Sequence, residues 1–189
     1  MADYTLTAAP ALGGYEQDFD GVSLAEATGL AIVSIALPFG GEAKAEAALK
    51  TAFGTELPPV GKSALSKDGK TRLARLAPDQ LFALFDHDTP DAEPQIATKL
   101  NGAAYTTDQT DVWVGLTVSG TAARRVLERI CPLDLYPTTF AEGDVARTVM
   151  EHLGVVILRT GEDSFLLLSA SSSAKSFLHA VEMSVSNTT

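Results

Sequence analysis

The chain has 189 residues, 46% of them hydrophobic and 20% charged, which is the composition of a folded protein rather than of a disordered one. Its formal net charge of -10 disfavours nucleic acid and anionic membranes as partners. The single cysteine, Cys131, excludes an internal disulfide and is typical of a reducing compartment. Residues 1–20 show no signal peptide, and no apolar run approaches the roughly 20 residues of a membrane span. We therefore expect a soluble cytoplasmic protein.

Residues 1–28 carry Ala9-Pro10, Gly13-Gly14 and scattered acids without a sustained hydrophobic period. This pattern predicts an irregular N-terminal arm. Residues 29–189 are expected to form a single domain made of two similar halves, about 29–104 and 105–189.

The first half reads as strand, helix, three strands, helix. A run rich in β-branched residues predicts a buried strand, and the helix that follows ends at Gly54. Asp68-Gly69 and Pro78-Asp79 are turn sequences that separate three short strands. The expected elements are a strand at 30–37, a helix at 45–53, strands at 60–65, 71–76 and 81–85, and a helix at 91–101.

The same order returns in the second half. An alternating strand leads through Gly120 into a helix with one apolar face, which ends before Pro132. Three strand candidates and a final amphipathic helix follow. The expected elements are a strand at 112–118, a helix at 122–130, strands at 145–151, 155–159 and 164–168, and a helix from 173.

Corresponding elements are displaced by roughly 80 residues, so the order indicates an internal duplication. Meandering strands pair antiparallel, and helices with a single apolar face cover only one face of each sheet. The sequence therefore predicts an α+β fold of two antiparallel sheets with helices packed on one face of each.

Two glycine-containing motifs are candidates for a phosphate site. Gly61-Lys62-Ser63 resembles the end of a phosphate-binding loop, but Glu56 occupies the position of the first required glycine. Gly40-Gly41 precedes a helix without G-x-G-x-x-G spacing, which favours a sharp strand-to-helix turn. Neither motif predicts a nucleotide.

The sequence also lacks a motif for metal binding or for a catalytic nucleophile. His87, His152 and His179 lie in different elements without Cys or carboxylate residues at metal-ligand spacing. His87, between Asp86 and Asp88, is expected in a solvated turn beside Pro90. Cys131 has no C-x-x-C partner and is expected to be buried, and no G-x-S-x-G is present. We expect no catalytic, cofactor-binding or metal residues.

Candidate contact residues cluster on the helix after Gly120. Arg124, Arg125 and Arg129 share its exposed side with Glu128, at spacings that permit ion pairs. The alternatives are a solvated helix face and a surface that binds carboxylates of a partner, which planar guanidinium groups suit. Asp134, in the proline-flanked loop that follows, has either a structural role or a contact role.

A further set of residues in the second half forms a recognisable series: Val118-Ser119-Gly120-Thr121-Ala122-Ala123-Arg124-Arg125-Val126-Leu127, Cys131-Pro132-Leu133-Asp134-Leu135, Phe140, Gly143 and Ala146-Arg147-Thr148. This series resembles the gamma subunits of heterotetrameric sarcosine oxidase, in which a strand enters a Ser-Gly turn and an Ala-Arg helix, followed by an Asp-Leu loop, a Phe, a Gly and a strand with Thr. The resemblance extends from about Leu30 to the end of the chain and is strong from Val112 onward.

The resemblance implies a fold like the folate-binding domain of glycine-cleavage T-proteins. It further implies partners: an alpha subunit with NAD and a tetrahydrofolate site, a beta subunit with FAD and covalent FMN, and a zinc-binding delta subunit. That assembly oxidatively demethylates sarcosine to glycine, makes hydrogen peroxide and passes the one-carbon unit to tetrahydrofolate. The gamma chain is expected to hold no cofactor and not to be catalytic by itself.

Two other functions stay open at this point. A stand-alone folate-dependent aminomethyltransferase-like protein has the same type of fold, although such enzymes carry a further C-terminal domain and are about twice as long. An iron-sulfur assembly factor of this fold requires a Lys-Gly-Cys signature, whereas Cys131 lies in Ile130-Cys131-Pro132.

Overall fold

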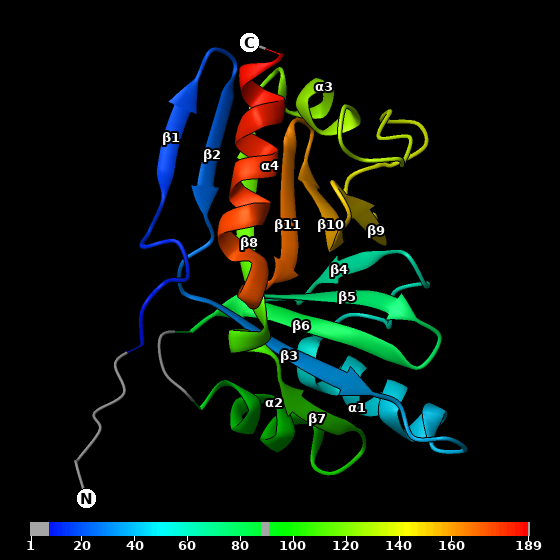
Figure 1. Cartoon of the computed structure of the whole chain (residues 1–189). Helices are drawn as coiled ribbons and strands as arrows, with labels where there is room; N and C mark the ends of the chain where they lie inside the picture. Colours follow the sequence, from blue (N-terminus) through cyan, green and yellow to red (C-terminus); the bar gives the residue numbers. More distant parts are fainter. Residues whose placement is uncertain (1–7, 88–90, 189) are drawn as a thin grey trace, which may run out of the picture.

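Two antiparallel β-sheets packed against each other form the centre of the computed structural model, which describes residues 8–87 and 91–188 (Figure 1). Sheet A has the strand order β1 (Glu16–Phe19), β2 (Val22–Glu26), β8 (Trp113–Ser119), β11 (Ser164–Ala170), β10 (Leu153–Gly161) and β9 (Val145–Met150). Sheet B has the order β4 (Ser63–Leu65), β5 (Thr71–Ala77), β6 (Gln80–Asp86), β3 (Leu30–Ala36) and β7 (Tyr105–Asp108).

Helices cover the outer face of each sheet. α1 (Glu42–Phe53) and α2 (Ala92–Leu100) pack on sheet B, while α3 (Ala123–Glu128) and α4 (Ala174–Ser186) pack on sheet A. Two 3-10 turns, η1 (Thr110–Val112) and η2 (Ser171–Ser173), precede β8 and α4. The result is four layers, helix–sheet–sheet–helix.

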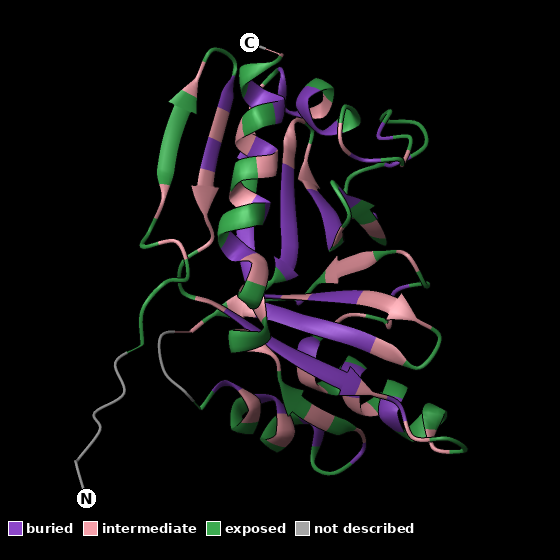
Figure 2. Ribbon diagram, in the orientation of Figure 1, coloured by how far each residue is buried: buried purple, intermediate pink, exposed green. Residues whose placement is uncertain are grey.

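Alternation along the central strands explains why both faces of sheet A are buried. In β10, Val155 and Ile157 face the helices, whereas Val156 and Leu158 face sheet B. Figure 2 shows the buried residues concentrated along the central strands and the exposed ones on the outer strands and loops. Because side chains alternate with a period of two, a fully apolar strand of this kind has to lie between two layers.

The duplicated order predicted from the sequence is confirmed. β3, α1, β4, β5, β6 and α2 repeat as β8, α3, β9, β10, β11 and α4, and each repeat places its two helices on one face of its sheet. The strand that precedes each repeat crosses to the other sheet: β2 pairs with β8, and β7 pairs with β3. This exchange ties the two sheets together through the chain itself.

The expected irregular arm is wrong for residues 16–26, which form the β1–β2 hairpin. β2 is buried through Val22 and Leu24 because it pairs with β8, more than 90 residues away in the chain. The Glu26 carboxylate also accepts hydrogen bonds from the backbone N–H groups of Leu12 and Gly14, at 2.9 and 2.8 Å. The hairpin turns at Asp20-Gly21, a dipeptide typical of two-residue turns, so a local signal was present; only the burial of β2 depends on its distant pairing with β8.

Candidate functional site

The three candidate arginines are positioned by the turn between β8 and α3. At Gly120 the backbone has φ 111°, and a Cβ atom there would meet the carbonyl oxygen of Gly21 at 2.4 Å, so the turn requires glycine. α3 then buries Ala123, Val126 and Leu127 against sheet A. Because this face of α3 is buried, the positions that carry the arginines lie toward the surface.

Arg124 is held in a small cluster by neighbours on both sides. Its Nη1 lies 2.6 Å from Oε1 of Glu128, and its guanidinium lies 5.3 Å from the ring centre of Tyr136. Asp134 accepts a hydrogen bond from the backbone N–H of Tyr136 at 2.9 Å, which fixes the loop that carries the ring. The predicted i,i+4 ion pair is therefore present, and Asp134 has a local structural role.

The side chains of Arg125 and Arg129 are more exposed to solvent than that of Arg124. Arg125 donates a 3.3 Å hydrogen bond to the carbonyl oxygen of Thr188, and both arginine side chains are exposed. Neither has a carboxylate within ion-pair distance in the part of the chain that the structure describes. We call Arg124, Arg125, Arg129, Asp134 and Tyr136 the arginine surface.

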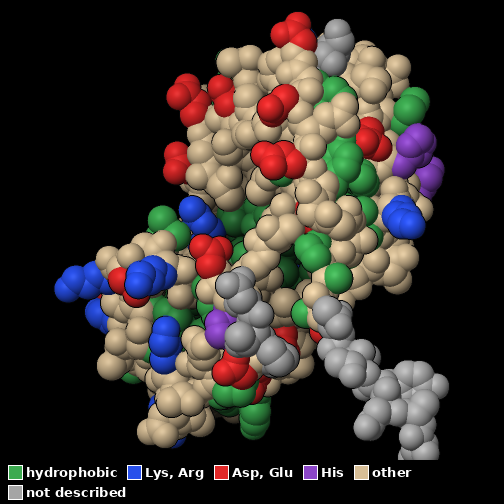
Figure 3. Space-filling model, turned by 90° about the vertical axis from the view of Figure 1, so that its left-hand side faces the viewer, with side chains coloured by type: hydrophobic (Ala, Val, Ile, Leu, Met, Phe, Trp, Pro, Cys, Tyr) green, Lys and Arg blue, Asp and Glu red, His purple; other side chains and the backbone are tan. Residues whose placement is uncertain are grey.

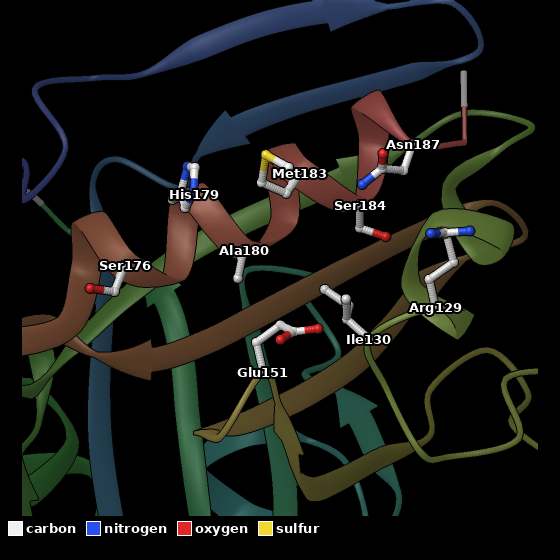
Figure 4. A pocket seen from close by; sticks show the side chains of 9 residues that line it. All are labelled: Arg129, Ile130, Glu151, Ser176, His179, Ala180, Met183, Ser184 and Asn187. Atoms are coloured by element: carbon white, nitrogen blue, oxygen red, sulfur yellow. The ribbon is translucent and has the colours of Figure 1, made fainter.

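A cavity of about 410 Å³ adjoins the arginine surface (Figure 4). Arg129 and Ile130 stand at one side of it, and Glu151, from the turn between β9 and β10, stands at another. One face of α4 supplies the remaining wall, with Ser176, His179, Ala180, Met183, Ser184 and Asn187. The cavity thus combines a cation, a carboxylate and an exposed methionine on rigid elements.

The charge of the chain is unevenly distributed. Figure 3 shows Asp and Glu side chains over the part of the molecule where the β1–β2 hairpin lies, and most Lys and Arg of that view gathered on the opposite part. On the face away from that view, the three arginines of the arginine surface outnumber the two acids beside them, Glu128 and Asp134, so this surface is a local positive region on a chain of net charge -10. Such a region favours acidic groups of a binding partner.

The residues of the rejected phosphate motif have a structural role. Lys62 forms an ion pair with Asp144 at 2.5 Å, and Ser63 bonds the carbonyl oxygen of Gly143 through both its backbone N–H and its hydroxyl group. Gly61, with φ 81°, accepts the N–H of Val145. The motif therefore joins sheet B to sheet A.

The remaining candidates occupy ordinary packing positions. Gly40 and Gly41 form the sharp turn into α1. Cys131 is 5% exposed, and burial raises the pKa of its thiol. His87 bonds Asp91 at 2.8 Å with a side chain only 16% exposed, so the expected solvated position is wrong; Asp88 and Pro90 lie outside the described residues.

Within residues 8–87 and 91–188, no group of three or more His, Cys, Asp or Glu side chains is arranged to hold a metal ion. No helix in the same ranges is long and apolar enough to cross a membrane.

Sequence reasoning missed Tyr136 and the α4 wall of the cavity. Tyr136 is 54% exposed and lies directly before Pro137, so an aromatic residue in a proline-flanked loop was the available signal. Met183 is 47% exposed on the side of α4 that faces away from the core. An exposed methionine on an otherwise polar helix face was the corresponding signal there.

The fold is that of the T-protein class. It is similar to the glycine cleavage system aminomethyltransferase T of Bartonella henselae, with a TM-score of 0.64 at 17% identity, covering 85% of this chain and 45% of that one. It is also similar to a chain of the heterotetrameric sarcosine oxidase of Corynebacterium sp. U-96, with a TM-score of 0.75 at 27% identity, covering 88% of this chain and 84% of that one. The first likeness concerns the fold alone.

The sarcosine oxidase gamma subunit family matches residues 40–186, and the chain belongs to this family. It is 33% identical over 134 residues to the sarcosine oxidase subunit gamma of Corynebacterium sp. (strain P-1), covering 70% of this chain and 66% of that protein. It is 33% identical over 123 residues to the subunit gamma of Arthrobacter sp, covering 65% of this chain and 60% of that protein. The matches thus span slightly less than two thirds of these relatives.

Proposed function

We propose that this chain is the gamma subunit of a heterotetrameric sarcosine oxidase and that it supports assembly without catalysing a step itself. The match to the gamma subunit family over residues 40–186 carries this proposal. The likeness to a chain from a heterotetrameric sarcosine oxidase supports it, because that likeness extends over most of both chains.

The proposed complex oxidatively demethylates sarcosine to glycine and transfers the one-carbon unit to tetrahydrofolate. Its partners are alpha, beta and delta subunits, which hold NAD, tetrahydrofolate, FAD, FMN and zinc. This chain contributes surfaces rather than a reaction centre. The free Cys131 accords with a cytoplasmic location, where thiols stay reduced.

We assign the arginine surface as a contact with a partner subunit. Arginine and tyrosine are enriched at the centres of interfaces, because both bury a large planar group and keep a polar end. Here Arg124 and Tyr136 are held in place before binding, so little side-chain entropy is lost on docking. Arg125 and Arg129 are available for carboxylates of the partner.

The test is the double variant Arg125→Glu/Arg129→Glu, assayed for binding to the other subunits and for thermal melting of the free chain. Lys175→Glu, an exposed charge reversal in the first turn of α4, is the matched control. We expect the double variant to bind at least about tenfold more weakly, with unchanged melting, because both side chains are exposed.

Equal binding by the double variant and the control would show that the arginine surface is not part of the interface. A wild-type chain that binds none of the other subunits would remove the subunit role as a whole.

A further inference from the structure

The cavity beside the arginine surface carries opposite charges on two of its sides. Arg129 stands on one side, directly after α3, and Glu151 stands on another, in the turn between β9 and β10 (Figure 4). Within residues 8–87 and 91–188 the two side chains form no ion pair with each other or with a third residue. A guanidinium and a carboxylate that line one cavity without pairing are both available to a ligand.

Apolar side chains line the cavity between the two charges. Ile130 and Ala180 are half-buried, and Figure 4 shows the carboxylate of Glu151 directed toward Ile130. The volume of about 410 Å³ lies within the range of small-molecule sites, roughly 300–1,000 Å³. A ligand in this cavity therefore meets two opposite charges and an apolar surface.

The walls of the cavity are held in place by the protein itself. The hydroxyl of Ser184 donates to the carbonyl oxygen of Val126 at 2.6 Å, which holds α4 against α3. The turn that carries Glu151 is closed by the pairing of Met150 with Leu153. Because these elements are ordered without a ligand, little conformational entropy is lost when one binds.

Glu151 occupies its turn at a cost in backbone energy. Its φ of 46° lies in the left-handed region, which Asn and Gly adopt more easily than a residue with a longer side chain. Residues held in such conformations are concentrated at binding and active sites. The position of this carboxylate on the cavity wall agrees with a binding role.

We propose that the cavity binds an apolar α-amino acid. Its carboxylate bonds the guanidinium group of Arg129, its ammonium group bonds the carboxylate of Glu151, and its side chain packs on Ile130 and Ala180. A simple anion would be repelled by Glu151 and a simple cation by Arg129, so the two walls together select a zwitterion. The inference goes beyond the proposed function, because every residue of the site belongs to this chain.

The test measures the binding of leucine to the full chain by isothermal titration calorimetry. Two analogues each keep one of its charges: isocaproate lacks the ammonium group, and isopentylamine lacks the carboxylate. We expect leucine to bind with a Kd of about 1 mM or tighter. Each analogue should bind at least about tenfold more weakly, because it loses one charged hydrogen bond and meets a like charge.

Four variants locate the site. Arg129→Gln and Glu151→Gln each remove one charge of the cavity and should weaken leucine binding at least about tenfold. Arg125→Gln, in the same helix but outside the cavity, and Glu46→Gln, on the exposed side of α1, are the matched controls and should leave binding unchanged. All four side chains are exposed, so the melting temperatures should stay close to that of the wild type.

The outcomes separate this site from the subunit role. The inference is overturned if leucine shows no saturable binding up to about 10 mM, if isocaproate binds as well as leucine, or if both cavity variants bind like the controls. Each of these results leaves the subunit role in place, because assembly is not measured. If the wild type binds leucine as expected but binds no other subunit, the proposed function fails and the amino-acid site stands.

Discussion

The Nζ atom of Lys62 lies 2.5 Å from Oδ1 of Asp144, across the junction where sheet B meets sheet A. The side chain of Asp144 is only 9% exposed, and its other oxygen accepts the N–H of Ala141 at 3.0 Å. This ion pair is one of several polar connections between the two sheets: Ser63 bonds the carbonyl oxygen of Gly143 beside it, and Arg147 donates to Gln80 at 3.1 Å. The rest of the junction is apolar.

Replacing Lys62 by Met should lower the free energy of unfolding by about 1–3 kcal/mol, because it leaves a nearly buried carboxylate without its cation. Urea unfolding with an unchanged m-value measures the loss. Lys50→Met is the matched control, since the Lys50–Glu56 pair has the same 2.5 Å distance but side chains 62% and 76% exposed. That change should cost less than about 1 kcal/mol. Equal losses in the two variants would show that the sheet junction does not depend on the ion pair.

The turn between β9 and β10 should be stabilised by changing Glu151-His152 to Asn-Gly. Both residues have positive φ, 46° and 70°, a backbone region that two-residue hairpin turns require and that Asn and Gly adopt at lower cost. The expected gain is about 1 kcal/mol in the free energy of unfolding, measured by urea unfolding. In the β10–β11 turn, where Asp163 lacks a positive φ, Asp163→Gly should lower stability instead. A loss of stability in the Asn-Gly variant would contradict the hairpin geometry.

Alkaline pH should weaken the attachment of the N-terminal segment to α4. The hydroxyl of Tyr15 donates to Glu182 at 2.7 Å, and burial, together with this hydrogen bond and the charge of Glu182, raises the pKa of Tyr15 from 10.0 to about 12. The unfolded chain therefore loses the phenol proton first, so the stabilisation is fully present below pH 10 and is lost as the pH rises through about 12.

Urea unfolding of the wild type and Tyr15→Phe, at about pH 9 and about pH 11, measures this loss. Because other groups also titrate in this range, the quantity to compare is the difference between the two proteins. The wild type should lose more stability than Tyr15→Phe, and Glu182→Gln should return the pKa of Tyr15 toward its ordinary value. Identical pH dependence of the wild type and Tyr15→Phe would exclude the linkage.

The repeated order of elements was accessible from the sequence because it depends on local signals. Each signal is set by a few neighbouring residues: Gly54 ends a helix, Asp68-Gly69 makes a turn, and a short apolar run forms β3. β7 was not accessible in this way, since it pairs with a strand of the other repeat and its short sequence is mostly polar. The β1–β2 hairpin did have a local signal in its Asp20-Gly21 turn, and only the burial of β2 against β8 depends on the other repeat.

The features of the candidate site also separate into those set by local sequence and those set by packing between elements. The spacing of Arg124 and Glu128 within one helix predicted their ion pair, because a helix fixes that distance locally. The ring of Tyr136 over Arg124 and the cavity beside Arg129 depend on how separate elements pack. Packing of this kind has no one-dimensional pattern, so these features required the structure.

The central claim is tested most directly by isolating the complex through a tag on this chain and determining its subunit masses by native mass spectrometry. The subunit role predicts that the chain is recovered with three different partner subunits, in an assembly that oxidises sarcosine only when those partners are present. Recovery of the chain alone, or sarcosine turnover by the isolated chain, would contradict it.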